Sequence, residues 1–568
     1  MMIKKLLNIK RACLLAGAMT AMNGCSIDVT PPDRYTEASM FANPKNMELY
    51  MIGLYAEFKT FAFGEFPIGY SNATDALTDI MKYTSTVSGN GTVNILATDA
   101  SRVNAAGPQL NYWQAGYSRI RRVNEFLNGL ANYAKVDEDT KKRYEAEARF
   151  VRGYVYLWLV KLHGSVVLLD NIDQYSTYKR NRSSEDECYK FIAADFAYAA
   201  ANLPKAWPTT GTGRATKGAA FGMLARTWLY AASVADYDKK QYNDDELTGI
   251  PNANATTYYT NAAAASDSVI QLAGEGYYKL EDSYAAAFTN KNSKESVFKI
   301  DYVAPGLTHN HDLGFAPKGD YPDNCLVYGV PTAELVDEYE MSDGSKFDWN
   351  NPVHAANPYQ NRELRFGASI LFNGASWKAR TINTTPGSVE GFVQYGSTTD
   401  PKTTVTGYYI RKMLTPEATN FVQLKSTLSW NEMRYAEVLL INAEAKAKIN
   451  NIEGARTSLK VVRDRANVPV TNAVNADQMM VAIEHERKLE LAFEGHRYWD
   501  LRRWRKAHIV LNAVRFHGHK VTPNGATFKY EVVEADDADR QFIKAMYYMP
   551  IITNELQANT GLDQIKPW

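Results

Sequence analysis

The sequence predicts a mainly α protein in which paired helices frame a large irregular region with small β elements. Apolar residues recur every three or four positions through most of residues 46–235 and again through 435–514, the spacing of helices that bury one face. Between these blocks, residues 236–429 are rich in Gly, Asn, Thr, Pro and Asp and hold only short strand-like runs. With 568 residues, 45% of them apolar, the chain can bury a large core.

The first 25 residues have the pattern of an export signal. Positive charges at Lys4, Lys5, Lys10 and Arg11 precede an apolar run over residues 12–22. This run is too short to cross a bilayer, so residues 1–24 are expected to be a signal peptide. Gly24 and Cys25 then resemble the acylation site of bacterial lipoproteins, although Met22 departs from the usual leucine. Cys25 is the expected lipidation site, and an ordinary secretory peptide with an incidental cysteine is the alternative.

Residues 25–45, which include Pro31 and Pro32, are expected to form a tether between the lipid and the folded body. After cleavage the remaining thiols are Cys188 and Cys325, too few for a disulfide framework, and whether they pair stays open. No later stretch approaches about 18 uninterrupted apolar residues, so nothing after Cys25 is expected to span a membrane.

The apolar spacing predicts six helices, over residues 113–130, 144–162, 188–203, 216–232, 435–449 and 452–466. The last two flank Asn450 and Asn451, and their alanines allow the close approach of tetratricopeptide-like hairpins. Short strands are expected at 296–303 and 404–413, and a hairpin around Pro523, Asn524 and Gly525. One body is therefore expected, with an N-terminal helical part over 46–235, an irregular ligand-binding region over 236–429, and C-terminal helical pairs and a tail over 430–568.

The chain shows no motif for a familiar catalytic route. Gly-x-Ser-x-Gly, Gly-Lys-Ser/Thr and Gly-x-Gly-x-x-Gly sequences are missing, so no enzyme activity and no cofactor are expected. Glu486, Glu490 and Glu494 recur every four residues around Arg487, which predicts ion pairs within one helix rather than a pair of glycosidase carboxylates.

Two further clusters have a structural interpretation. A stretch with Trp499, Trp504 and several arginines predicts an amphipathic helix whose arginine stems cover buried indoles. A net charge of zero argues against nucleic acid as its partner. The pairs His309 with His311 and His517 with His519 lack the neighbouring ligands of a zinc site, so no metal is expected.

Aromatic residues make up 12% of the chain, and 36 of them are tyrosines. A sugar site needs a few exposed rings and short polar side chains, and loops on a rigid frame can present both. Two loop regions hold this mixture of rings and short polar side chains. The second region also contains His311, Asp320 and Asn324. The candidate ligand-binding residues are Tyr70, Asn72, Asp75 and Tyr83 in the first region and Tyr302, His309 and Tyr321 in the second. Roles in the core or in turns are the alternative for each.

Several stretches carry a family resemblance. One runs over residues 147–164 and another over 214–230. The most specific begins with Arg434, Tyr435, Ala436 and Glu437 and ends with Glu494, Gly495, Arg497, Trp499 and Asp500. Their order resembles the SusD/RagB family of outer-membrane nutrient-binding lipoproteins, although Gly153, Ser165 and Val167 depart from its commoner residues.

The resemblance implies a function as well as a fold. It implies a non-catalytic, lipid-anchored protein of the outer-membrane surface that captures a glycan and passes it to a SusC-like TonB-dependent transporter. A peptide-binding member of the same family and a helical protein-interaction scaffold are the alternatives. The identity of the ligand is not implied.

Overall fold

The computed structural model describes residues 36–64, 74–86, 92–106, 110–177, 179–208, 211–238, 246–321, 324–417 and 425–568. The predicted signal peptide, Cys25, Tyr70 and Asn72 lie outside these ranges. The long helices are α3 (Pro44–Tyr55), α5 (Trp113–Tyr133), α6 (Glu138–His163), α7 (Glu185–Asn202), α8 (Lys217–Ser233), α9 (Ala255–Gly274), α15 (Tyr435–Lys448), α16 (Ile452–Ala466) and α17 (Ala476–Glu490). The predicted mainly α fold is confirmed.

Shorter elements join these helices. The short helices are α2 (Glu37–Phe41), α4 (Thr92–Thr98), α10 (Ala286–Thr289), α11 (His311–Phe315), α12 (Ala333–Glu338), α13 (Pro352–Ala356), α14 (Leu364–Ser369), α18 (Arg497–Arg503), α19 (Ala507–Val510) and α20 (Thr553–Ala558). The strands are β1 (Met81–Tyr83), β2 (Ser296–Ile300), β3 (Gly329–Pro331), β4 (Ile370–Leu371), β5 (Ser376–Trp377), β6 (Arg380–Thr381), β7 (Tyr409–Ile410), β8 (Trp430–Arg434), β9 (His517–Asn524) and β10 (Thr527–Glu534).

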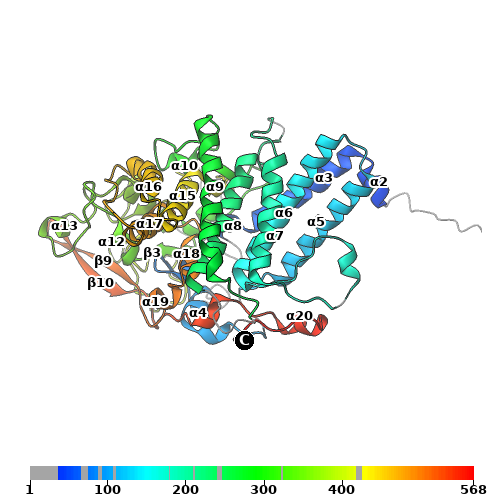
Figure 1. Cartoon of the computed structure of the whole chain (residues 1–568). Helices are drawn as coiled ribbons and strands as arrows, with labels where there is room; N and C mark the ends of the chain where they lie inside the picture. The colour runs from blue at the N-terminus through cyan, green and yellow to red at the C-terminus, as the bar shows by residue number, and fades with distance from the viewer. Residues whose placement is uncertain are drawn as a thin grey trace, which may run out of the picture.

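The long helices pack side by side in chain order from α5 to α9, and α15 continues the row against α9 (Figure 1). Their starts are fixed by local chemistry. Ser184 and Glu187 form a reciprocal capping box on α7, and Thr216 caps α8 by accepting from the backbone N–H of Ala219. The six predicted helices are all present; five start within three residues of the predicted position, and α6 starts six residues earlier.

Two segments contain helices that the sequence did not predict. The region over 236–429 contains the 20-residue helix α9, which its polar residues concealed. Ala262, Ala263 and Ala265 are buried there, and alanine combines a small volume with the highest helix propensity. Within the expected tether over 25–45, residues 37–41 form α2, and Phe41 is buried against Gly129 of α5.

The strands form five two-stranded antiparallel sheets in the described part of the chain. The predicted strand at 296–303 corresponds to β2, and the predicted hairpin to β9 and β10. The predicted strand at 404–413 is wrong over most of its length. There, the hydroxyl of Thr404 accepts from the backbone N–H groups of Thr406, Gly407 and Tyr408 and closes a turn instead.

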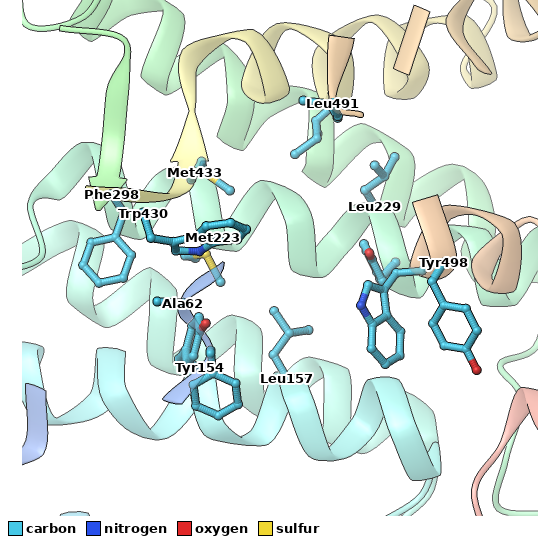
Figure 2. Packing of buried hydrophobic residues seen from close by; sticks show 14 of the residues in the cluster. Ala62, Tyr154, Leu157, Met223, Leu229, Phe298, Trp430, Met433, Leu491 and Tyr498 are labelled. Atoms are coloured by element: carbon cyan, nitrogen blue, oxygen red, sulfur yellow. The ribbon is translucent and has the colours of Figure 1, made fainter. Parts of the chain in front are cut away.

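The core lies where α6 and α8 meet the β2–β8 ribbon (Figure 2). Tyr154 and Leu157 from α6 face Met223 and Leu229 from α8, and Trp430 and Met433 from β8 close the cluster. A Cβ atom on Gly222 would lie 2.2 Å from the sulfur of Met433, so a larger residue there would displace the Met433 side chain where α8 crosses β8.

A second, ionic core surrounds α17, and it corrects a prediction. Glu486, Glu490 and Glu494 are buried and pair with other segments rather than within their helix, which ends at Glu490. The ion pairs are Arg365 with Glu486 and Glu490, Arg434 with Glu490 and Glu494, Arg463 with Glu486, Arg465 with Glu490, and Lys412 with Glu494. Although burial alone would raise it, these arginines lower the pKa of Glu490 to about 2. Glu490 therefore stays ionised throughout the neutral pH range.

Two of the arginines beside Trp499 and Trp504, Arg502 and Arg503, are likewise not at the surface. Arg503 is buried and pairs with Glu444 and Asp500, and Arg502 donates to backbone carbonyl groups. The prediction that these arginine stems cover the indoles from outside is therefore wrong for Arg502 and Arg503, because their guanidinium groups find their hydrogen-bond and ion-pair partners inside the protein. Cys188 and Cys325 are both unpaired and buried. No described helix is both long and apolar enough to pass through a lipid bilayer.

Candidate ligand-binding surface

The two loop regions predicted to bind ligand lie against each other. β1 and β3 pair in antiparallel register, with Tyr83 opposite Gly329. The backbone N–H of Thr84 donates to the carbonyl of Tyr328 at 3.0 Å and extends the ribbon by one residue. The rings of Tyr83 and Tyr328 stack with centroids 5.7 Å apart and planes 5° apart. The fold therefore brings segments that are far apart in the sequence into contact.

Tyr321 is the predicted residue whose ring reaches the described surface, with 38% of its area exposed. The backbone beneath it is tightly held, because the carbonyl of Tyr321 accepts from the N–H groups of Asn324 and Cys325, each at 3.0 Å. The preceding side chain, Asp320, is almost wholly buried. An exposed ring next to a fixed, buried carboxylate loses little entropy when a ligand stacks on it.

Asp320 is fixed by three groups from the β5–β6 hairpin. The indole N–H of Trp377 donates to both carboxylate oxygens at 3.0 Å, Lys378 pairs at 2.9 Å and Arg380 at 2.5 Å. Arg380 also pairs with Glu390 at 2.6 Å. The β5–β6 hairpin, Glu390 and the Asp320 side chain are therefore cross-linked through Arg380. We call residues 318–321 with the β5–β6 hairpin the Tyr321 platform.

Sequence reasoning missed this hairpin for a specific reason. Its two turn residues, Lys378 and Ala379, have φ angles of +46° and +59°. Turns of this kind favour Asn and Gly, which can adopt positive φ without strain. Because neither residue is present, the segment lacks the usual signal, and the partnership of Trp377 with Asp320 across 57 residues leaves no local pattern.

Tyr302 and His309 are buried in the body beneath this surface. The ring of His309 lies 3.9 Å from that of Phe63 and 4.7 Å from that of Tyr302. Its Nε2 lies 3.1 Å from the carbonyl of Leu428. Burial lowers the pKa of His309 to about 4, so this imidazole is neutral at pH 7. Both side chains contribute to core packing in this structure.

Asp75 and Tyr83 are also buried. One carboxylate oxygen of Asp75 accepts from the N–H of Gly495 at 2.9 Å, and burial raises the pKa of the group to about 7. The structure thus brings the described parts of the predicted regions together, and among the predicted residues it describes, Tyr321 is the most exposed. Tyr328, which is partly exposed, is an additional ring at the same edge.

Two hollows in the protein lie away from the Tyr321 platform. One of about 420 Å³ is lined by α5, α6 and α7, and another of about 450 Å³ is lined mainly by α12, α17 and the loop between α12 and α13. Their linings are mostly charged, and Tyr321 contributes to neither. In the described parts of the chain, no cluster of three or more His, Cys, Asp or Glu side chains is placed to hold a metal ion.

Paired helices with small two-stranded ribbons define a mainly α protein of the tetratricopeptide-like helical class. Comparison with known proteins identifies the family. A profile of the SusD family matches residues 294–568, and a related profile, described as starch-binding associating with outer membrane, matches residues 54–229. The chain belongs to the SusD/RagB family.

Individual relatives agree over most of the chain. A SusD-like protein of Bacteroides ovatus is 24% identical over 520 residues, covering 89% of this chain and 83% of that protein. The crystal structure of a SusD-like protein from Bacteroides fragilis NCTC 9343 superimposes with a TM-score of 0.77 at 25% identity, covering 93% of this chain and 98% of the other. A SusD-like carbohydrate binding protein from the same strain gives 0.75 at 24% identity over 92% and 100%.

Proposed function

We propose that this protein is a non-catalytic lipoprotein of the outer-membrane surface that captures an oligosaccharide and passes it to a SusC-like TonB-dependent transporter. The observation that carries the proposal is the Tyr321 platform, because an exposed ring beside the fixed Asp320 side chain suits the apolar face of a sugar. The carbohydrate-binding relative and the outer-membrane description of the matching profile support the ligand class and the location.

Titration calorimetry of the purified full chain against a glycan panel tests the ligand, and chromatography of the same mixtures tests for cleavage. Tyr321→Ala is expected to weaken binding about fivefold, because a stacked ring contributes roughly 1 kcal/mol. Tyr277→Ala is the matched control, since its ring is 37% exposed at the end of α9. Shortened products would overturn the non-catalytic proposal, and binding of peptide pools instead of glycans would favour the peptide-binding alternative.

The anchor is tested separately. Cys25→Ala is expected to abolish incorporation of labelled palmitate and to release the protein from membranes, because one acylated thiol is the proposed attachment. Persistent labelling would contradict the assignment of Cys25. Co-purification of the wild-type chain with a TonB-dependent barrel from the same cells tests the proposed partner. Recovery of the wild-type chain without any barrel would contradict the proposed partnership.

A further inference from the structure

The outer face of α3 exposes apolar side chains that the core does not use. Leu49 and Ile52 are three positions apart, lie on one face of the helix and are 66% and 54% exposed. The opposite face is complete, because Met47, Met51 and Leu54 are fully buried. Leu49 and Ile52 therefore cannot move into the core, and their exposure needs another explanation.

The same face is positively charged. Lys45 lies one turn before Leu49, and Lys59 lies in the 3₁₀ turn that continues α3. Both lysines are exposed, and neither forms an ion pair with any residue that the structure describes. The acidic residues of this segment are already neutralised, Glu48 by Arg214 at 2.7 Å and Glu57 by Arg119 and Arg122 at 2.7 and 2.8 Å. Two positive charges flanking an apolar pair are complementary to an anionic lipid surface.

The position of α3 in the chain places it near the anchor. Thr36, which caps α2, is 11 residues from Cys25, so the connecting chain can span at most about 40 Å. α2 packs against both α3 and α5, and Figure 1 shows α2 and α3 at the end of the molecule opposite α16 and α17. A lipid on Cys25 would hold this end of the body, rather than the opposite one, close to the bilayer.

We propose that the outer face of α3 rests on the bilayer, with Leu49 and Ile52 in the headgroup region and Lys45 and Lys59 against lipid phosphates. This inference rests on the acylated Cys25 of the proposed function. It adds an orientation, because two contacts with the membrane fix the body where a single flexible tether would not. The Tyr321 platform then has a defined direction relative to the membrane surface.

The test uses full-length acylated protein reconstituted into vesicles of phosphatidylethanolamine and phosphatidylglycerol. An environment-sensitive dye is attached to Leu49→Cys or to the control Val481→Cys, a position on α17 that is 70% exposed. Cys188 and Cys325 are buried and do not compete for the dye. Dye at position 49 is expected to shift to the blue and to brighten roughly twofold on reconstitution, because it leaves water for the interface. Dye at position 481 is expected to remain unchanged.

Charge provides a second measurement. Adding Lys45→Gln or Lys59→Gln to the labelled chain is expected to weaken the contact of α3 with phosphatidylglycerol vesicles about fivefold per lysine, measured from the dye signal against lipid charge. Palmitate labelling is recorded on every sample. If palmitate-labelled protein shows no more change in dye fluorescence at position 49 than at position 481, the inference is overturned while the anchor at Cys25 stands. Missing palmitate would overturn the anchor and the inference with it. A change in the position-49 dye that requires the transporter instead of lipid would overturn the inference and assign the outer face of α3 to contact with the transporter.

Discussion

Asp75 accepts a 2.9 Å hydrogen bond from the backbone N–H of Gly495, while its other oxygen is buried without a partner among the described residues. Burial is the largest cause that raises the pKa of this group, from 3.8 to about 7. The folded state therefore binds this proton more tightly than the unfolded state does. Its contribution to stability is greatest below about pH 4 and is lost as the pH rises to about 7.

Asp75→Asn removes this titration and keeps an oxygen for Gly495. We expect its free energy of unfolding to exceed that of the wild type by about 2 kcal/mol at pH 8 and to match it near pH 4, because three pKa units set an upper bound of about 4 kcal/mol. Urea unfolding between pH 4 and 8 measures the difference. Asp282→Asn, whose side chain is 99% exposed, should show none. A difference that does not depend on pH would contradict the assigned titration.

Arg434 is expected to be among the most costly residues to replace. Its guanidinium group is buried and contacts Glu490 at 3.1 Å and Glu494 at 2.6 Å. Arg434→Met leaves buried carboxylates unpaired and should lower the free energy of unfolding by about 3–5 kcal/mol. The control Arg121→Met breaks an exposed pair with Glu125 and should change it by less than about 0.5 kcal/mol. Adding Glu494→Gln to Arg434→Met should recover part of the loss, and simple additivity would argue against a coupled network.

Two glycines predict opposite signs for the same change. A Cβ atom on Gly129 would lie 2.0 Å from the ring of Phe41, so Gly129→Ala forces α2 away from α5 and should destabilise the protein by about 1–3 kcal/mol. Gly274, at the end of α9, has nothing within 4 Å of an added Cβ. Gly274→Ala should therefore stabilise by about 0.5–1 kcal/mol. Thermal unfolding of both variants measures the contrast, and a stable Gly129→Ala variant would contradict the close α2–α5 contact.

Local patterns in the sequence predicted the local parts of this fold. The apolar spacing of α5 to α8 and the capping residue Thr216 act over a few residues, so they are visible in the chain. The helix α9 was missed because alanines are buried on a narrow face among polar neighbours, which weakens the periodic signal.

Tertiary partners were the part that could not be predicted. The four-residue repeat of Glu486, Glu490 and Glu494 suggests intrahelical pairs, yet their arginine partners come from positions up to 125 residues away. The candidate surface shows the same limit. Tyr321 was selected by location, but its support by Asp320 and Trp377 depends on a hairpin without the usual turn residues. The burial of Tyr302 and His309 was equally invisible, because a loop composition does not reveal depth.

The β1–β3 ribbon also sets an order of events for the growing polypeptide. Met81 is paired with Pro331, which lies 250 positions later in the chain. The row from α5 to α8 is built from neighbours in sequence and can form as soon as those segments are available, whereas the ribbon must wait until residue 331 has emerged. The β1–β3 ribbon and its Tyr83–Tyr328 stack are therefore completed late, and a chain truncated before β3 would form helices without acquiring that ribbon.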